Sequence, residues 1–250
     1  AKEADAYLCS MDDSAIYGYE VYMIGFGEAV DKQLLSDYKV LVLTLSEDQI
    51  PESLQKAIAD KTQEINTDDA SKLIGCINAL SKRMLLDAEL LRESDPSPMR
   101  RALAFCQSIK VSKKITNIFN TQKDAYYDSL TAEERLQVVS VESDHIDGTM
   151  GASMRDDKLS WLKAAPQDGN ECRILTNVRC LSEGVDVPSL DAVMFLSARN
   201  SQVDVVQSVG RVMRKSPDKK YGYIIIPVVV PANVKPDRKS TRLNSSHRIR

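Results

Sequence analysis

The sequence has no long apolar run, and nothing at its start resembles a signal peptide. A membrane-spanning helix needs about 20 consecutive apolar residues, so no segment predicts one. We therefore expect a cytoplasmic protein with no membrane partner. With 250 residues, 43% of them hydrophobic, the chain is long enough for one large or two small domains around a buried core.

Cysteine is scarce and irregularly spaced. The chain has five cysteines, an odd number, and no C-x-x-C pair. This usage is typical of a reduced compartment and predicts neither a zinc site nor a disulfide framework. We expect no metal bound by this chain's own side chains. The five are Cys9, Cys76, Cys106, Cys172 and Cys180.

The formal net charge of −3 conceals an acidic body and a basic end. Residues 237–250 carry a net charge of +4, which leaves −7 for the rest. The composition of this tail resembles the in-frame translation of a DNA-sequencing adapter, and we expect it to be an artefact rather than native sequence. The alternative is a basic arm for nucleic acid. An acidic body argues against duplex binding through overall charge, so any DNA contact is expected in a local groove.

Apolar runs and helical patterns alternate along most of the chain, which predicts an α/β fold with a parallel sheet covered on both faces. A hairpin of two helices, which precedes the sheet or is inserted into it, is expected over 51–95, with a cap cluster at Asn66–Asp69 before the second helix. The hairpin carries no catalytic constellation, so a structural or partner-contacting role is expected. Strands are predicted at 38–45, 101–107, 138–141, 172–177, 191–196 and 221–227, and helices at 112–120 and 154–164.

One further helix, ending at Arg214, has two chemically distinct faces. At about 100° per residue, one face carries Gln207, Gly210, Arg211 and Arg214. Ser201 and Asp204 predict an N-terminal cap for this helix. Arginine pairs well with phosphate oxygens, and Gly210 leaves room for a close approach, so a phosphate is the expected ligand. The alternative is an ordinary amphipathic helix with a solvated basic face. The opposite face is apolar: Val205, Val206, Val209, Val212 and Met213.

Several segments, in order, resemble superfamily 2 helicases and translocases, in the form found in restriction-enzyme helicase subunits and related DEAD/DEAH-box proteins. Thr176-Asn177 ahead of Ser182–Pro188 is similar to motif V, and Gln207–Arg214 to motif VI. Weaker similarities link other segments to the same family. His145–Gly148 and Arg155 are similar to the segment between motifs IV and V. Arg101–Gln107 is similar to the start of motif IV, and Gly25–Val40 to the crossover from the first to the second RecA-like domain.

The resemblance implies a RecA-like fold and a set of site residues. Arg211 and Arg214 would be arginine fingers toward a triphosphate, with Gln207 ordering the cleft. Gly184, Asp186 and Gly210 would lie beside the nucleotide. Nucleic-acid contacts are implied for Thr176, Asn177, His145 and Gly148, although His145 is equally well explained as a turn or capping residue.

The resemblance also implies a missing partner domain, because none of the ten glycines lies in a G-x-x-x-x-G-K-[ST] phosphate loop. ATP and Mg²⁺ would be held mainly by a first RecA-like domain upstream. The expected domains are the end of that first domain with its connector (1–36), an opening strand plus the helical hairpin (37–98), and the second RecA-like domain (99–236). The expected function is the C-terminal motor half of an ATP-dependent DNA helicase or translocase from a restriction-modification or phage-defence system. Alone, this half is expected to be inactive as an ATPase. The alternative is a RecA-like nucleic-acid scaffold without turnover.

Overall fold

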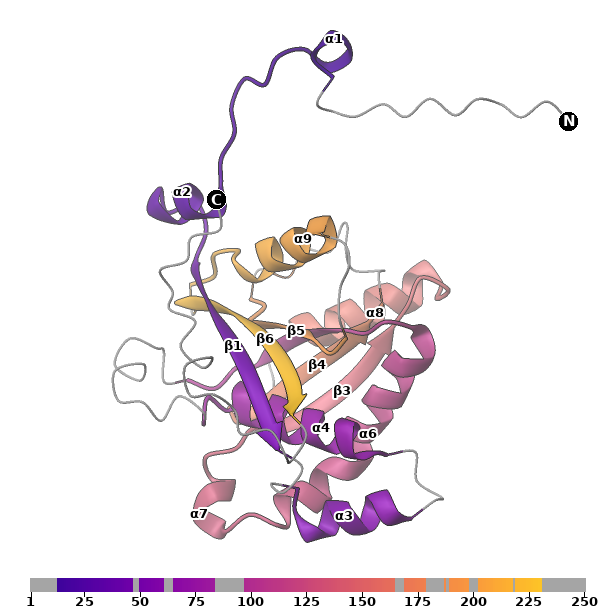
Figure 1. Cartoon of the computed structure of the whole chain (residues 1–250). Coiled ribbons are helices and arrows are strands. Elements are labelled where there is room, and N and C mark those ends of the chain that lie inside the picture. The colour runs from indigo at the N-terminus through magenta and orange to yellow at the C-terminus, as the bar shows by residue number, and fades with distance from the viewer. Residues whose placement is uncertain are drawn as a thin grey trace, which may run out of the picture.

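The computed structural model describes residues 13–46, 50–60, 65–83, 97–164, 169–178, 187, 189–197, 202–217 and 219–230. Their centre is one sheet in which all the strand pairings are parallel (Figure 1). The strand order is β1-β6-β5-β2-β4-β3. This confirms the predicted α/β fold, since parallel strands require crossover connections. The strands are β1 (Asp37–Ser46), β2 (Arg101–Phe105), β3 (Ser140–Ile146), β4 (Glu171–Asn177), β5 (Ala192–Phe195) and β6 (Tyr221–Val230).

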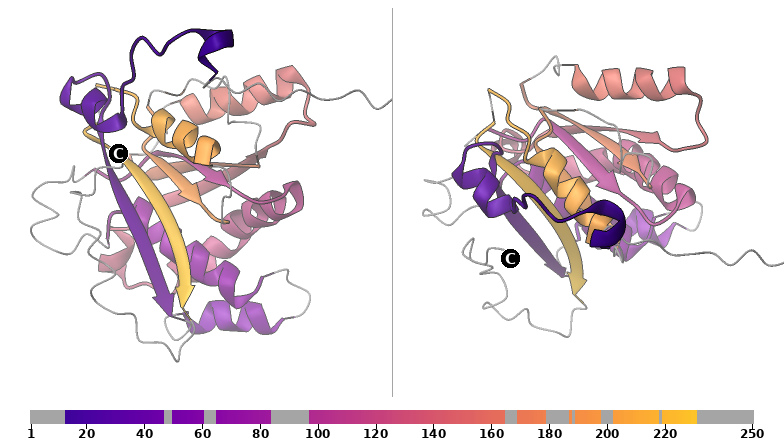
Figure 2. Two further views of the ribbon diagram at one scale, coloured as in Figure 1. Left: turned by 45° about the horizontal axis from the view of Figure 1, so that its top comes forward. Right: turned by 90° about the horizontal axis from the view of Figure 1, so that it is seen from above.

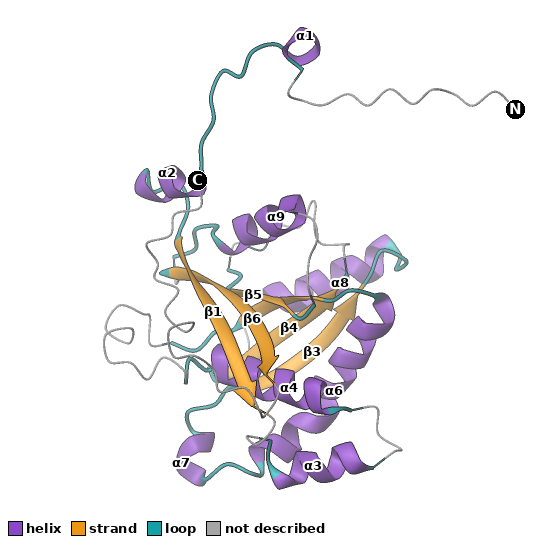
Figure 3. Cartoon of the chain, viewed as in Figure 1, coloured by secondary structure: helices purple, strands orange, loops and turns teal. Residues whose placement is uncertain are grey.

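Helices cover both faces of the sheet, as the sequence predicts (Figure 3). On one face, α3 (Glu52–Ala59), α4 (Thr67–Leu80) and α6 (Ile109–Tyr127) pack on a core that includes Leu54, Ile77 and Phe119. On the other face, α8 (Ala152–Lys163) and α9 (Gln202–Val212) share a second core that includes Leu162, Val212 and Ile224. Three shorter helices complete the described elements: α1 (Ser14–Tyr17), α2 (Phe26–Asp31) and α7 (Ala132–Arg135).

The predicted cap at the start of α4 is confirmed. The Asn66 side chain accepts a hydrogen bond from Asp69 N at 2.8 Å, and the Asp69 carboxylate accepts one from Asn66 N at 3.2 Å. This reciprocal capping box satisfies two amides that a helix start leaves without partners. A short ion pair of 2.6 Å between Asp69 and Lys114 ties the same cap to α6.

The structure describes part of the predicted helical hairpin, and its helix α4 packs directly against the sheet. Ten of the fourteen residues of α4 are buried, and α4 contacts β1, β6 and α6. Strand β1 pairs along its length with β6, so the segment before residue 99 completes the same sheet. The structure thus supports a structural role for α4, while residues 84–96 lie outside the described residues.

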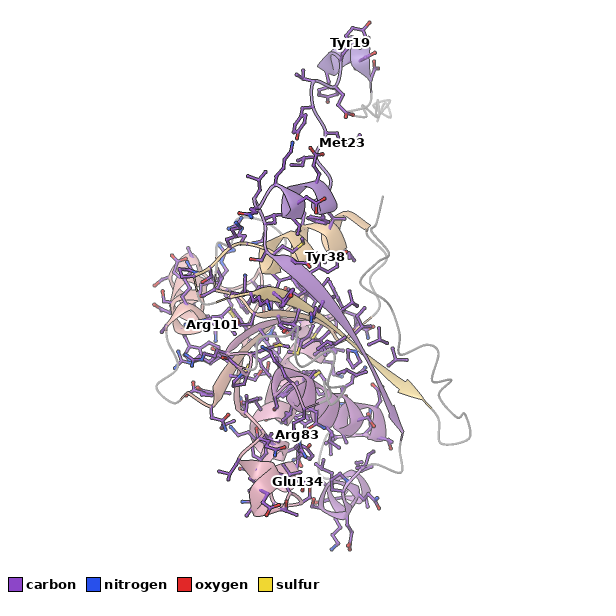
Figure 4. All side chains as sticks on the ribbon, turned by 90° about the vertical axis from the view of Figure 1, so that its left-hand side faces the viewer. Tyr19, Met23, Tyr38, Arg83, Arg101 and Glu134 are labelled. Carbon is purple, nitrogen blue, oxygen red and sulfur yellow. The ribbon has the colours of Figure 1, made fainter. Side chains whose placement is uncertain are left out.

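An extended segment leads into the sheet from α1. Residues 18–25 have no helix or strand assignment, and several of their large side chains are exposed, with Val21 at 97% and Tyr19 at 89%. Tyr19 and Met23 lie far from the sheet, whereas Arg83 and Glu134 lie at the opposite end of the molecule (Figure 4). In the described part of the chain, no helix is both long and apolar enough to cross a membrane.

Candidate functional site

Helix α9 packs as its sequence pattern predicts along most of its apolar face. Val209, Val212 and Met213 are buried at 7%, 0% and 0% exposure. Val206 differs from the prediction, because 45% of it is exposed. The helix covers β5 and β6 (Figure 2). Its buried face is rotated away from Val206 and toward Ser208 and Arg211, which are 2% and 9% exposed. The expected cap residue Ser201 lies outside the described residues, while Asp204 lies in the first turn.

The two arginines differ in exposure. Arg214 is exposed, as is Gln207, whereas only 9% of Arg211 is exposed. The prediction that the non-apolar face of the helix presents both guanidiniums therefore agrees with the exposure of Arg214 but not with that of Arg211. In this conformation Arg214 is the outer group, and Arg211 lies against the protein.

The space beside Gly210 is occupied by an aromatic ring. A Cβ added to Gly210 would lie 3.8 Å from Phe26 Cε1, an ordinary van der Waals distance. Helix α2 thus packs on the same face of α9 that the sequence assigns to a phosphate. Packing alone does not require glycine here, because an alanine would fit.

The end of α9 is held by segments that the sequence analysis did not single out. The Ser36 amide, just before β1, donates to Met213 O at 2.7 Å. Lys219 Nζ, just before β6, donates to Val212 O at 3.0 Å and to Leu190 O at 3.1 Å. A lysine in the last turn of a helix is a known C-terminal signal, but Lys219 lies beyond that turn, so only the fold reveals its contact with Val212.

A buried polar cluster lies where β3 and β4 end and α6 begins. The Thr176 hydroxyl receives a hydrogen bond from Ser112 Oγ at 2.8 Å and lies 2.6 Å from Thr116 Oγ1. His145 Nδ1 lies 2.7 Å from Ser112 Oγ. Thr176 and Ser112 are fully buried and His145 is 6% exposed, so these side chains face one another rather than solvent. Ser112 and Thr116 were not predicted, because only the fold brings α6 over these strands.

Asp147 connects this cluster to the exposed loop before α8. Its carboxylate lies 2.8 Å from His145 Nε2 and accepts hydrogen bonds from the amide and hydroxyl of Thr149. The hydrogen bond from the Thr149 hydroxyl is the largest influence lowering the pKa of Asp147, followed by that from His145. Lys113 Nζ lies 4.0 Å from Asp147 Oδ2. Gly148, in the same loop, is exposed.

Asn177 ends β4 on the opposite side of the sheet from Thr176. It is fully buried, and its Nδ2 donates to Ala104 O at 3.2 Å, while its Oδ1 has no hydrogen-bond partner among the residues that the structure describes. A buried acceptor without a donor is costly, so this atom suits a partner from outside the described residues. Gly184 and Asp186, the motif V pair, lie outside the described residues.

The predicted residues thus form two groups. Thr176 and His145 meet under α6, whereas Gln207, Gly210, Arg211 and Arg214 lie on or just after α9, which packs on the other face of the sheet. Their roles toward nucleotide and nucleic acid stay predictions. No group of three or more His, Cys, Asp or Glu in the described part of the chain could hold a metal ion.

Comparison with known proteins identifies relatives of this chain. The chain is 40% identical to the type ISP restriction-modification enzyme LlaBIII in its DNA-bound structure, with a TM-score of 0.77 over 92% of this chain and 14% of that one. A fragment described as an HsdR subunit of a type I restriction enzyme from Vibrio vulnificus YJ016 is 17% identical, with a TM-score of 0.53, and shares the fold.

Curated relatives match a shorter stretch. "Probable helicase A859L" of African swine fever virus is 42% identical over 69 residues, which are 27% of this chain and 8% of that protein. The chain therefore spans only a small part of LlaBIII and of this viral relative. The model of the helicase conserved C-terminal domain matches residues 81–216, more than half of the chain. The chain accordingly belongs to the helicase conserved C-terminal domain family.

Proposed function

We propose that this chain is the C-terminal motor half of an ATP-dependent DNA translocase of the restriction-enzyme kind. In this proposal, a first RecA-like domain of the same parent chain holds ATP and Mg²⁺, and α9 supplies Arg211 and Arg214 to the triphosphate. The observation that carries the proposal is the pair of arginines at the end of α9, Arg211 within the helix and Arg214 just after it, in a chain 40% identical to a DNA-bound restriction enzyme over 92% of its length.

The chemistry of α9 suits a phosphate. Guanidinium groups donate bidentate hydrogen bonds to phosphate oxygens and stabilise the negative charge that develops during phosphoryl transfer. Bound Mg²⁺ would neutralise charge on the β- and γ-phosphates. Arg214 is already exposed, so we expect it to meet the nucleotide first, with Arg211 joining when the two domains close.

The end of the sheet near β3 and β4 suits a nucleic-acid backbone. Because Thr176 and His145 are buried and hydrogen-bonded to neighbours, we propose that they support this surface, and that exposed main-chain groups near Gly148 make the contact. Lys113, which is 61% exposed at the first turns of α6, adds positive charge there. The acidic body makes this a local contact.

The proposal is tested by DNA-stimulated ATP hydrolysis in the parent protein. We expect Arg211→Ala and Arg214→Ala each to lower kcat by about 10³-fold or more, as for other arginine fingers. Lys215→Ala, an exposed neighbour, is the control and should leave kcat within about twofold. Absence of DNA-stimulated hydrolysis in the parent protein, with DNA binding intact, would favour a scaffold without turnover. Unchanged hydrolysis in both arginine variants would contradict their role as arginine fingers. The 250-residue chain alone should show no appreciable ATPase, because its sequence has no phosphate loop.

A further inference from the structure

The ammonium of Lys219 joins two segments that lie far apart in the chain. One hydrogen bond, 3.0 Å long, reaches the carbonyl oxygen of Val212, the last residue of α9. The other, 3.1 Å long, reaches the carbonyl oxygen of Leu190, whose amide in turn donates to Val187 O at 3.1 Å. Val187 belongs to the segment that resembles motif V, and α9 carries motif VI. Lys219 therefore bridges the ends of the two motifs.

We infer that Lys219 is a positioning residue that fixes the last turn of α9 against the segment after Pro188, and so sets where Arg211 and Arg214 point. The inference rests on the proposed function for its consequence in catalysis. The contact itself is a property of this fold.

The carbonyl groups at the end of α9 need donors from elsewhere. The last carbonyls of a helix have no partner within the helix, and a lysine side chain can supply the missing hydrogen bond. Its positive charge also interacts favourably with the negative end of the helix dipole. Lys219 does this for Val212, and the Ser36 amide does it for Met213. Both carbonyls between the two arginines are thus held from outside the helix.

The geometry around Val212 leaves little freedom for movement. The backbone of Gly222 passes so close that an added Cβ would clash with the carbonyl group of Val212. The Val212 carbonyl therefore cannot move toward β6 without disturbing that strand, so one end of the hydrogen bond from Lys219 is fixed.

The charges around Lys219 favour the same arrangement. Burial lowers the pKa of Lys219 to about 8, and the negative charge of Asp191 opposes this effect. Asp191 is itself fixed, because its carboxylate accepts hydrogen bonds from the amides of Arg100 and Arg101 at 2.8 and 3.0 Å. The ammonium is thus held at a junction where β2, β5 and β6 begin and α9 ends.

The test compares Lys219→Met with Lys220→Met. Lys220 is the adjacent lysine, exposed, with its ammonium 5.2 Å from the centre of the Tyr221 ring. In the 250-residue chain, we expect Lys219→Met to speed amide hydrogen exchange in residues 209–214 by about tenfold or more, and Lys220→Met to leave it unchanged. Lys219→Arg, which keeps the charge and the donors, should restore slow exchange. Should Lys219→Met fail to fold, Lys219→Gln serves the same comparison.

The catalytic consequence is measured in the parent protein. Lys219→Met should lower kcat for DNA-stimulated ATP hydrolysis by about tenfold or more while KM for ATP stays within about threefold, because the lost contact acts on the arginines rather than on substrate binding. Lys219→Arg should recover most of kcat.

Two outcomes would overturn the inference: unchanged exchange in Lys219→Met, or faster exchange with normal kcat while Arg211→Ala is impaired. If Arg211→Ala itself has normal kcat, the proposed function fails. The exchange measurement then still decides whether Lys219 holds α9.

Discussion

At the scale of single residues, two side chains occupy a backbone conformation that usually favours glycine. Gln33 and Lys82 both have φ of 57°, and each directly follows the C-cap residue of a helix, α2 and α4 respectively. The amide after each one closes the helix end: Leu34 N donates to Ala29 O, and Arg83 N donates to Asn78 O. Left-handed backbone costs a side-chain-bearing residue roughly 1 kcal/mol. At Lys82, favourable side-chain contacts offset this backbone cost. The side chain is buried, with 8% of the residue exposed, and its ammonium lies 4.9 Å from the centre of the Tyr223 ring.

The two positions should therefore respond oppositely to glycine. Gln33→Gly should raise the free energy of unfolding by about 0.5–1 kcal/mol, because it relieves the backbone without losing a buried group. Lys82→Gly should lower it by about 1–2 kcal/mol, because it removes the cation–π contact and the buried stem. Urea denaturation of both variants beside the parent chain measures the difference. A loss of stability in Gln33→Gly would show that the side chain contributes more than its backbone costs.

At the scale of elements, the fit between α9 and β6 depends on Gly222. An added Cβ there would meet the carbonyl group and a side-chain methyl of Val212. We expect Gly222→Ala to lower the free energy of unfolding by about 1–3 kcal/mol, the usual range for overpacking. Gly25→Ala is the control, because a Cβ at Gly25 would have no neighbour within 4 Å. Thermal denaturation measures both, and equal melting temperatures would contradict the predicted clash.

The elements themselves could be predicted from the sequence, but their side-chain contacts could not. Apolar runs located the strands, and Asn66 with Asp69 located the start of α4, because both signals are local. The cluster of Ser112, His145 and Thr176 depends on three segments that meet only after folding. The burial of Arg211 depends in the same way on neighbours distant in sequence. Helical periodicity specifies a face of a helix, but not which neighbour will cover it.

At the scale of the whole molecule, the buried carboxylates of Asp147 and Asp191 make the free energy of unfolding depend on pH in opposite directions. Hydrogen bonds from Thr149 and His145 lower the pKa of Asp147 in the folded state. The stability that Asp147 contributes is therefore fully present above about pH 3.9, the pKa of an aspartate in the unfolded chain, and is lost as the pH falls below it. Burial raises the pKa of Asp191, so the folded state takes up a proton before the unfolded state does. That difference favours folding as the pH falls toward 4.

These signs predict the behaviour of two matched variants in urea denaturation at pH 7 and pH 3.5. Asp147→Asn should lower the free energy of unfolding by about 1–2 kcal/mol at pH 7, because a hydrogen bond to a charged acceptor is worth more than one to a neutral amide. The same variant should lose less stability than the parent chain when the pH falls to 3.5. Asp191→Asn should lose more, because it lacks the group that takes up a proton on folding. The two variants sit at opposite ends of the sheet, so equal losses from pH 7 to pH 3.5 in both would mean that acid sensitivity arises from the net charge of the molecule rather than from these sites.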